Sequence, residues 1–140
     1  MSELIWKKNI EAMRQRYPLV AEAFDESPKS DMTVGVDVVC DKKVLYTVQN
    51  AETYQLDTLY DTDQLMELWY QNLPKIYFRS KILMFGLGNG MYVKKILRET
   101  SDDVTMIVYE PALSILQVVM QEYDISELLC SKRVTLLVNQ

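Results

Sequence analysis

The pattern of apolar and polar positions divides the chain into two parts, and the first combines helices with a hairpin. Helical periodicity covers residues 3–16, and Pro18 suits the first turn of a second, short helix. Alternation with a period of two predicts strands that pair as an antiparallel hairpin around a short connection. The expected elements are helices over 3–16, Leu19–Phe24 and Asp61–Leu73, strands over Thr33–Cys40 and Val44–Val48, and a weaker strand over Tyr54–Leu59.

The second part alternates strands with helices. Its strands are apolar on both faces, which predicts a parallel sheet covered by helices on both sides. Right-handed crossovers then give the strand order 3-2-1. The expected elements are strands over Ile82–Phe85, Val104–Tyr109 and Val134–Val138, helices over Met91–Arg98 and Pro111–Tyr123, and a helical turn over Ile125–Leu129.

These patterns predict an α/β protein with two regions. Residues 1–75 form an N-terminal α+β region of helices and a β-hairpin. Residues 76–140 form the first half of a Rossmann-like domain, with a truncated three-stranded parallel sheet of the methyltransferase-like kind. We expect the chain to be the front portion of a longer protein, and the edge of its first parallel strand to be covered by the hairpin over 33–48 or by a second copy of the chain.

Composition and charge exclude several classes of function. A net charge of −5 and a pI near 4.8 argue against binding to nucleic acid, and the basic residues Lys94, Lys95 and Arg98 are typical of one solvated helix face. The absence of histidine excludes nucleophiles activated by histidine and argues against a zinc site. We expect Cys40 and Cys130 to be buried thiols. No membrane span or secretory signal is recognisable, so we expect a cytoplasmic protein.

The glycine-rich turn after the first parallel strand is the one candidate site. Gly86, Gly88, Asn89 and Gly90 form the turn, and Glu110 ends the next strand 24 residues after Gly86. Such a loop lets a ligand approach the backbone, and a helix N-terminus beyond it favours an anionic or polar group. A carboxylate at this distance commonly accepts hydrogen bonds from ribose hydroxyls. We therefore predict that these five residues bind a nucleotide or an S-adenosylmethionine-like cofactor.

Two interpretations of this turn remain open. The GxGxG spacing is closer to that of S-adenosylmethionine-dependent methyltransferases than to the dinucleotide fingerprint, but Met84 stands where those enzymes carry an acidic residue. Alternatively, the glycines only permit close packing, and Glu110 caps the helix that Pro111 begins. The chain would then be a purely structural module.

Four stretches in a fixed order resemble a known family. They are WKKNIEAMRQRYPLVAEAF, YQLDTLYDTDQLMELWYQNL, KILMFGLGNGMYVKKIL and VTMIVYEPALSILQVVMQEYDISELL. Together they are similar to the N-terminal region of the flagellar motility accessory factor family. Asp57 and Thr58 depart from it, because family members often have His-Ser there.

The resemblance implies a function located mostly outside this chain. Proteins of that family are glycosyltransferases that attach nonulosonic sugars to Ser or Thr of flagellin from a CMP-activated donor. Their transferase centre lies in a domain that follows this region. The implied role is therefore a non-catalytic N-terminal portion with no catalytic residue of its own. Its implied partners are the remainder of a parent chain and flagellin, and a homodimer is an alternative.

Overall fold

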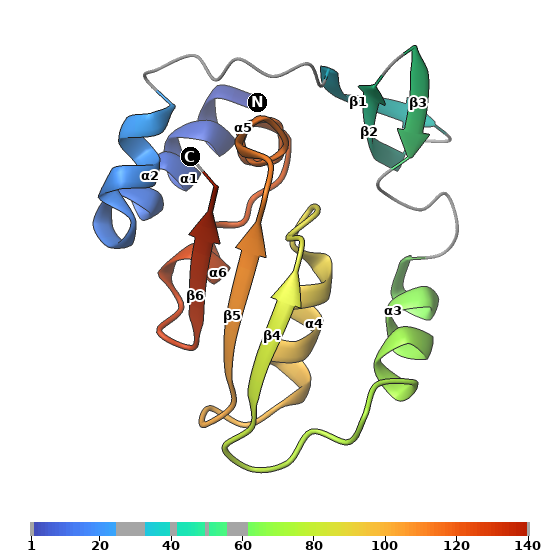
Figure 1. The fold of residues 1–140 in the computed structure, drawn as a ribbon, viewed down its shortest axis with the longest axis vertical. Helices are drawn as coiled ribbons and strands as arrows, with labels where there is room; N and C mark the ends of the chain where they lie inside the picture. Colours follow the sequence, from blue (N-terminus) through green and yellow to red (C-terminus); the bar gives the residue numbers. More distant parts are fainter. Residues whose placement is uncertain (1, 25–32, 40–41, 50, 56–61, 140) are drawn as a thin grey trace.

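The computed structural model describes residues 2–24, 33–39, 42–49, 51–55 and 62–139, and it contains two sheets (Figure 1). The antiparallel sheet has the order β1-β2-β3 and the parallel sheet has the order β4-β5-β6. The strands are β1 (Thr33–Val39), β2 (Lys42–Gln49), β3 (Glu52–Gln55), β4 (Lys81–Phe85), β5 (Thr105–Glu110) and β6 (Val134–Val138). The helices are α1 (Ser2–Arg16), α2 (Pro18–Ala23), α3 (Thr62–Gln71), α4 (Met91–Glu99), α5 (Leu113–Glu122) and α6 (Ser126–Cys130).

The mixed α/β class and the strand order of the parallel sheet are confirmed. β5 is the central strand, with Ile107 opposite Leu83 of β4 and opposite Thr135 of β6. The predicted hairpin is present as β1 and β2, where Val36 is opposite Leu45. The bounds of β6 match the prediction at both ends. The residues between α2 and β1, and Asp61 at the predicted start of the third helix, lie outside the described residues.

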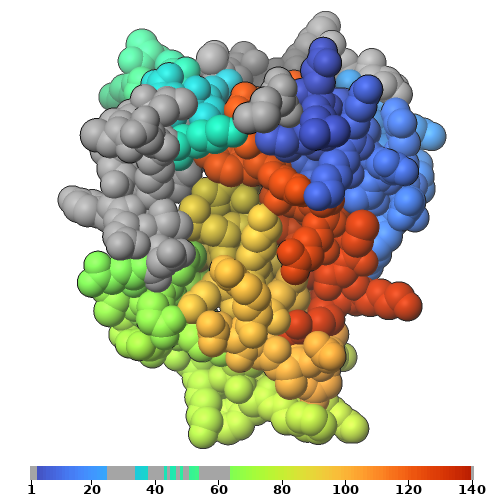
Figure 2. Space-filling model, turned by 180° about the vertical axis from the view of Figure 1, so that it is seen from behind, coloured from blue at the N-terminus to red at the C-terminus, as the bar shows by residue number. Residues whose placement is uncertain are grey.

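The parallel sheet is covered on one face only within the described part of the chain. Met106, Val108 and Leu136 are buried on the covered face, where α4 and α6 lie behind the strands (Figures 1 and 2). On the opposite face Leu83 and Phe85 are each 77% exposed. The expectation of helices on both faces is therefore wrong for these residues. Both crossovers advance in the same direction across the sheet, so right-handed connections place their helices on the same side.

The N-terminal helices share a buried core with the C-terminal part of the chain. α1 packs against α5 and α6, and its residues Ile10 and Met13 belong to the same buried cluster as Leu116 and Leu128. Asn9 is fully buried and forms hydrogen bonds with backbone groups of Met120 in α5 and of Tyr123 and Ile125, which lie between α5 and α6. The division of the chain at residue 75 stays a prediction.

Three local expectations need correction. α5 begins at Leu113 rather than at Pro111, because the Glu110 carboxylate accepts a hydrogen bond from the Ala112 N–H before the helix starts. Cys130 is exposed rather than buried, because Leu128 and Leu129 take the inward positions of α6. Cys40 lies outside the described residues. The hairpin forms a sheet separate from β4, so it does not extend the edge of the parallel sheet.

Candidate functional site

The glycine turn connects β4 to α4 through three glycines with positive φ. The φ angles are 91° at Gly86, 56° at Gly88 and 86° at Gly90. A Cβ added at Gly86 or Gly88 would meet nothing within 4 Å, whereas one at Gly90 would lie 2.9 Å from Leu128 Cδ2. Gly90 therefore lets the start of α4 approach α6. Gly86 and Gly88 present open backbone, as a ligand-binding loop requires.

Asn89 has a structural role at the start of α4. Its side chain is buried, and its Oδ1 accepts a hydrogen bond of 3.1 Å from the Met91 N–H. This bond satisfies one of the backbone donors that a helix N-terminus leaves without an intrahelical partner. The amide oxygen therefore already has a hydrogen-bond partner within the chain.

Glu110 ties the glycine turn to the start of α5. Its Oε1 accepts a hydrogen bond of 3.2 Å from the Leu87 N–H, and its Oε2 accepts one of 3.0 Å from the Ala112 N–H. The residue is 3% exposed, and this burial raises the pKa of its carboxyl, while hydrogen bonds from the Ala112, Leu87 and Gly88 N–H groups act in the opposite direction. The carboxylate that is predicted to accept hydrogen bonds from ribose hydroxyls therefore already accepts hydrogen bonds from backbone N–H groups of this chain.

The structure brings all five predicted site residues around one loop. Their geometry includes both an open backbone at Gly86 and Gly88 and a buried carboxylate already bonded to the chain. Within the described ranges, no three His, Cys, Asp or Glu residues are grouped so as to hold a metal ion. Cofactor binding by the five residues stays a prediction.

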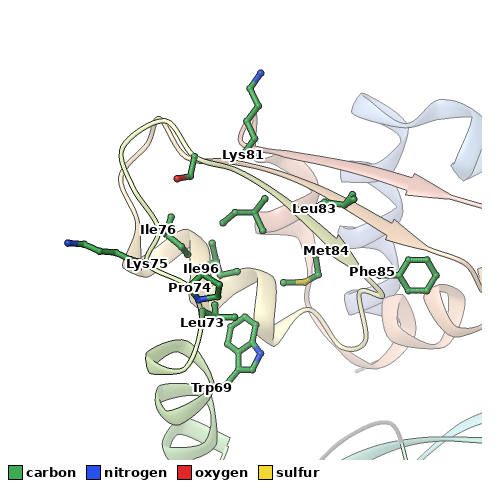
Figure 3. Close-up of a pocket in the computed structure, with 12 residues that line it drawn as sticks. Trp69, Leu73, Pro74, Lys75, Ile76, Lys81, Leu83, Met84, Phe85 and Ile96 are labelled. Atoms are coloured by element: carbon green, nitrogen blue, oxygen red, sulfur yellow. The ribbon is translucent and has the colours of Figure 1, made fainter.

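An apolar cavity that the sequence did not reveal lies beside the outer edge of β4. Its volume is about 460 Å³, and it lies between α3, the segment that follows α3, and β4 (Figure 3). Trp69 and Leu73 line it from α3 and the segment after α3, Ile82 and Met84 line it from β4, and Ile96 of α4 contributes to the wall. A signal was present in the helical spacing of Trp69 and Leu73, but nothing local showed that α3 would lie beside β4.

Helix α3 is held against α4 by an ion pair of Lys95, a residue that the sequence predicts on a solvated helix face. Lys95 is buried, and its Nζ lies 2.7 Å from Glu67 Oε2 and 3.0 Å from Glu99 Oε1. The hydrogen bond raises the pKa of Lys95 and lowers that of Glu67. The Trp69 and Tyr92 rings make an edge contact at 4.7 Å beside it. Lys95 therefore joins two helices and does not belong to a solvated face.

Each helix in the described ranges is too short or too polar to span a lipid bilayer. No protein-family model matches the chain, and no curated protein matches it in sequence. A solved structure, the MAf glycosyltransferase from Magnetospirillum magneticum AMB-1, is similar in fold, with a TM-score of 0.66 at 14% sequence identity. The similarity covers 100% of this chain and 28% of that chain. At this identity the likeness shows the fold alone, and the chain spans less than a third of the length of the protein that it matches.

Proposed function

We propose that the chain is the N-terminal, non-catalytic portion of a motility-associated glycosyltransferase that modifies Ser or Thr of flagellin with nonulosonic sugars. The fold likeness to a MAf glycosyltransferase along the whole of this chain carries the proposal. That likeness agrees with the resemblance of the sequence stretches around Trp6, Trp69 and Gly86 to the same family.

The chemistry of the glycine turn also supports a non-catalytic role. Transfer of a sugar to a hydroxyl calls for a base that can take the hydroxyl proton. Glu110 is the carboxylate at this turn, and both of its oxygens accept bonds from backbone N–H groups. A carboxylate held in this way organises the loop between β4 and α4, and on this proposal the transfer occurs in another part of the parent protein.

Sugar transfer by the purified chain tests the non-catalytic assignment. The chain is incubated with flagellin and a CMP-activated nonulosonic sugar, and the mass of intact flagellin is then measured. We expect no increase in mass. An increase by the mass of one or more sugars, lost on heat denaturation of the chain, would contradict the assignment.

A second candidate function is binding of a nucleotide-type cofactor at the glycine turn. The observation that favours it is the open space beside Gly86 and Gly88. Calorimetric titration with S-adenosylmethionine, S-adenosylhomocysteine and CMP tests this candidate directly. Binding would be expected to disappear in Gly88→Asn, because asparagine tolerates the left-handed backbone but places a side chain in that space.

The matched control for this titration lies away from the turn. Gln71→Asn changes an exposed side chain at the end of α3 and should leave any binding unchanged. Heat release that is equal in Gly88→Asn and in the unaltered chain would place the ligand elsewhere. No heat release with any of the three compounds would remove this candidate.

A further inference from the structure

β6 is an outer strand of the parallel sheet, and its outward backbone groups can be identified. The Met106 N–H donates to the Arg133 carbonyl, so the odd-numbered residues along β6 turn their backbone toward β5. In a parallel pair the intervening residues turn their N–H and C=O groups the other way. Val134, Leu136 and Val138 therefore direct these groups outward, to the side where another strand could pair with them.

The outward groups at the start of β6 already have partners within the chain. The Tyr17 hydroxyl accepts a hydrogen bond of 3.1 Å from the Leu136 N–H and donates one of 3.0 Å to the Val134 carbonyl. Arg16 Nη1 donates to the same carbonyl at 3.0 Å. The Val134 N–H donates to the Ser131 carbonyl at 3.3 Å. An added strand needs these groups in succession, so it could pair with β6 only by displacing Arg16 and Tyr17.

Arg16 also fixes the turn that leads from α6 into β6. Its Nη1 donates to the Ser131 carbonyl and, at 3.4 Å, to the Leu129 carbonyl. Its Cζ lies 5.2 Å from the centre of the Tyr17 ring, a cation–π contact that holds the two side chains together. The two residues therefore cover the strand and the turn before it as one unit.

The sequence explains why these two side chains reach β6. Pro18 begins α2, and the residue before a proline is kept out of the helical region. Tyr17 accordingly has φ −133° and ψ 62°, between the end of α1 at Arg16 and the start of α2. Figure 1 shows α1 and α2 on the side of the sheet where β6 lies. The break between the two helices thus directs adjacent side chains at the edge of the sheet.

From these observations we infer that Arg16 and Tyr17 block the outer edge of β6 against pairing with any further strand, including one from a second copy of the chain. We call these two side chains the edge cap. In a Rossmann-like sheet further strands add beyond the first strand, here β4, and the third strand stays terminal. β6 therefore needs a cover in a larger sheet as well. This inference does not rest on the proposed glycosyltransferase role.

Removal of the edge cap should allow a strand to pair with β6. The variant is Arg16→Ala/Tyr17→Ala in the whole chain, and the probe is a fluorescently labelled peptide with the sequence of residues 133–139, RVTLLVN. We expect fluorescence anisotropy to show at least about ten-fold tighter binding to this variant than to the unaltered chain. The edge of β4 is the same in both chains, so the difference between them isolates β6.

Two controls separate edge pairing from loss of stability. Val93→Ala removes buried apolar volume from α4, away from α1 and β6, so it should lower stability without any gain in peptide binding. A peptide of the same sequence with N-methyl groups on alternate amides cannot form the hydrogen bonds of strand addition, so the double variant should not bind it more tightly than the unaltered chain does. Equal binding of the unmethylated peptide to the double variant and the unaltered chain, or the same gain in Val93→Ala, would overturn the inference.

Tyr17→Phe decides the matter if circular dichroism shows that the double variant is unfolded. This change keeps the ring but removes the partner of the Leu136 N–H. Amide hydrogen exchange at Leu136 should then become faster relative to exchange at Met106, whose N–H is bonded within the sheet, and the peptide should slow it again. Exchange at Leu136 that is unchanged in Tyr17→Phe, or that the peptide does not slow, would contradict a role of Tyr17 in blocking this edge.

Discussion

Asn9 provides the most specific test of how the N-terminal helix is attached to the parallel half of the molecule. Its Nδ2 donates to the carbonyls of Met120 at 2.8 Å and Tyr123 at 2.7 Å, and its Oδ1 accepts from the Ile125 N–H at 3.0 Å. The residue is 0% exposed, so water cannot replace these bonds. At about 1 kcal/mol for each bond, Asn9→Ala should lower the free energy of unfolding by about 3 kcal/mol.

A carboxylate at position 9 should destabilise the chain more than the loss of the side-chain amide does. In Asn9→Asp the two donated bonds become contacts between a carboxylate and two carbonyl oxygens, and the carboxylate is buried without a cation. We expect a loss of about 4 kcal/mol at neutral pH, greater than the loss in Asn9→Ala, with partial recovery on acidification as the carboxyl takes up a proton.

Urea unfolding followed by circular dichroism measures both losses. Asn72→Ala is the matched control, because Asn72 is exposed and its side chain makes a single bond to the Leu68 carbonyl. The control should change the free energy of unfolding by less than about 1 kcal/mol. If Asn9→Ala were no more destabilising than Asn72→Ala, the proposed attachment of α1 between α5 and α6 would be refuted.

Three further predictions concern separate features of the fold. Hydrogen bonds from Ser126 and Lys8 lower the pKa of Asp124 from 3.8 to about 2, so its contribution to stability is full above pH 3.8 and is lost as the pH falls through 2. Because the carboxylate is 45% exposed, we expect it to contribute only about 1 kcal/mol to the free energy of unfolding. This contribution is the difference in the free energy of unfolding between the unaltered chain and Asp124→Asn, measured by urea unfolding across this pH range. Gly90→Ala should cost about 2 kcal/mol, since φ is 86° and the new Cβ would lie 2.9 Å from Leu128, whereas Gly88→Ala should cost about 1 kcal/mol. Tyr17→Phe should cost about 2 kcal/mol in the same assay, because two backbone groups of β6 lose their partner.

Secondary-structure elements that depend on residues close together in the sequence could be predicted. The apolar run over Val134–Val138 predicted the bounds of β6 correctly, and the glycines fixed the turn between β4 and α4. The start of α5 was misplaced because the Glu110 side chain bonds to the Ala112 N–H, a contact that the favourable position of Pro111 does not reveal. Glu110 lies beside the glycine turn, but the hydrogen bonds that occupy its carboxylate required the structure, and ligand binding by the five candidate residues stays a prediction.

Features that join distant parts of the chain could not be predicted. Asn9 meets backbone groups more than a hundred residues away, and Tyr17 reaches β6 across a similar separation. No periodicity encodes such pairs, because each depends on how α1 packs. The exposed sheet face that carries Leu83 was predicted wrongly for another reason. Two crossovers in one direction already imply helices on a single side of the sheet, and this rule was not applied.

The mass of flagellin in cells that make this protein tests the central claim most directly. The claim is that the chain is a non-catalytic part of a flagellin glycosyltransferase. Deleting the coding region for residues 2–139 should lower the mass of intact flagellin by that of one or more nonulosonic sugars, and restoring it should return the mass. Flagellin of unchanged mass in the deletion strain would contradict the claim.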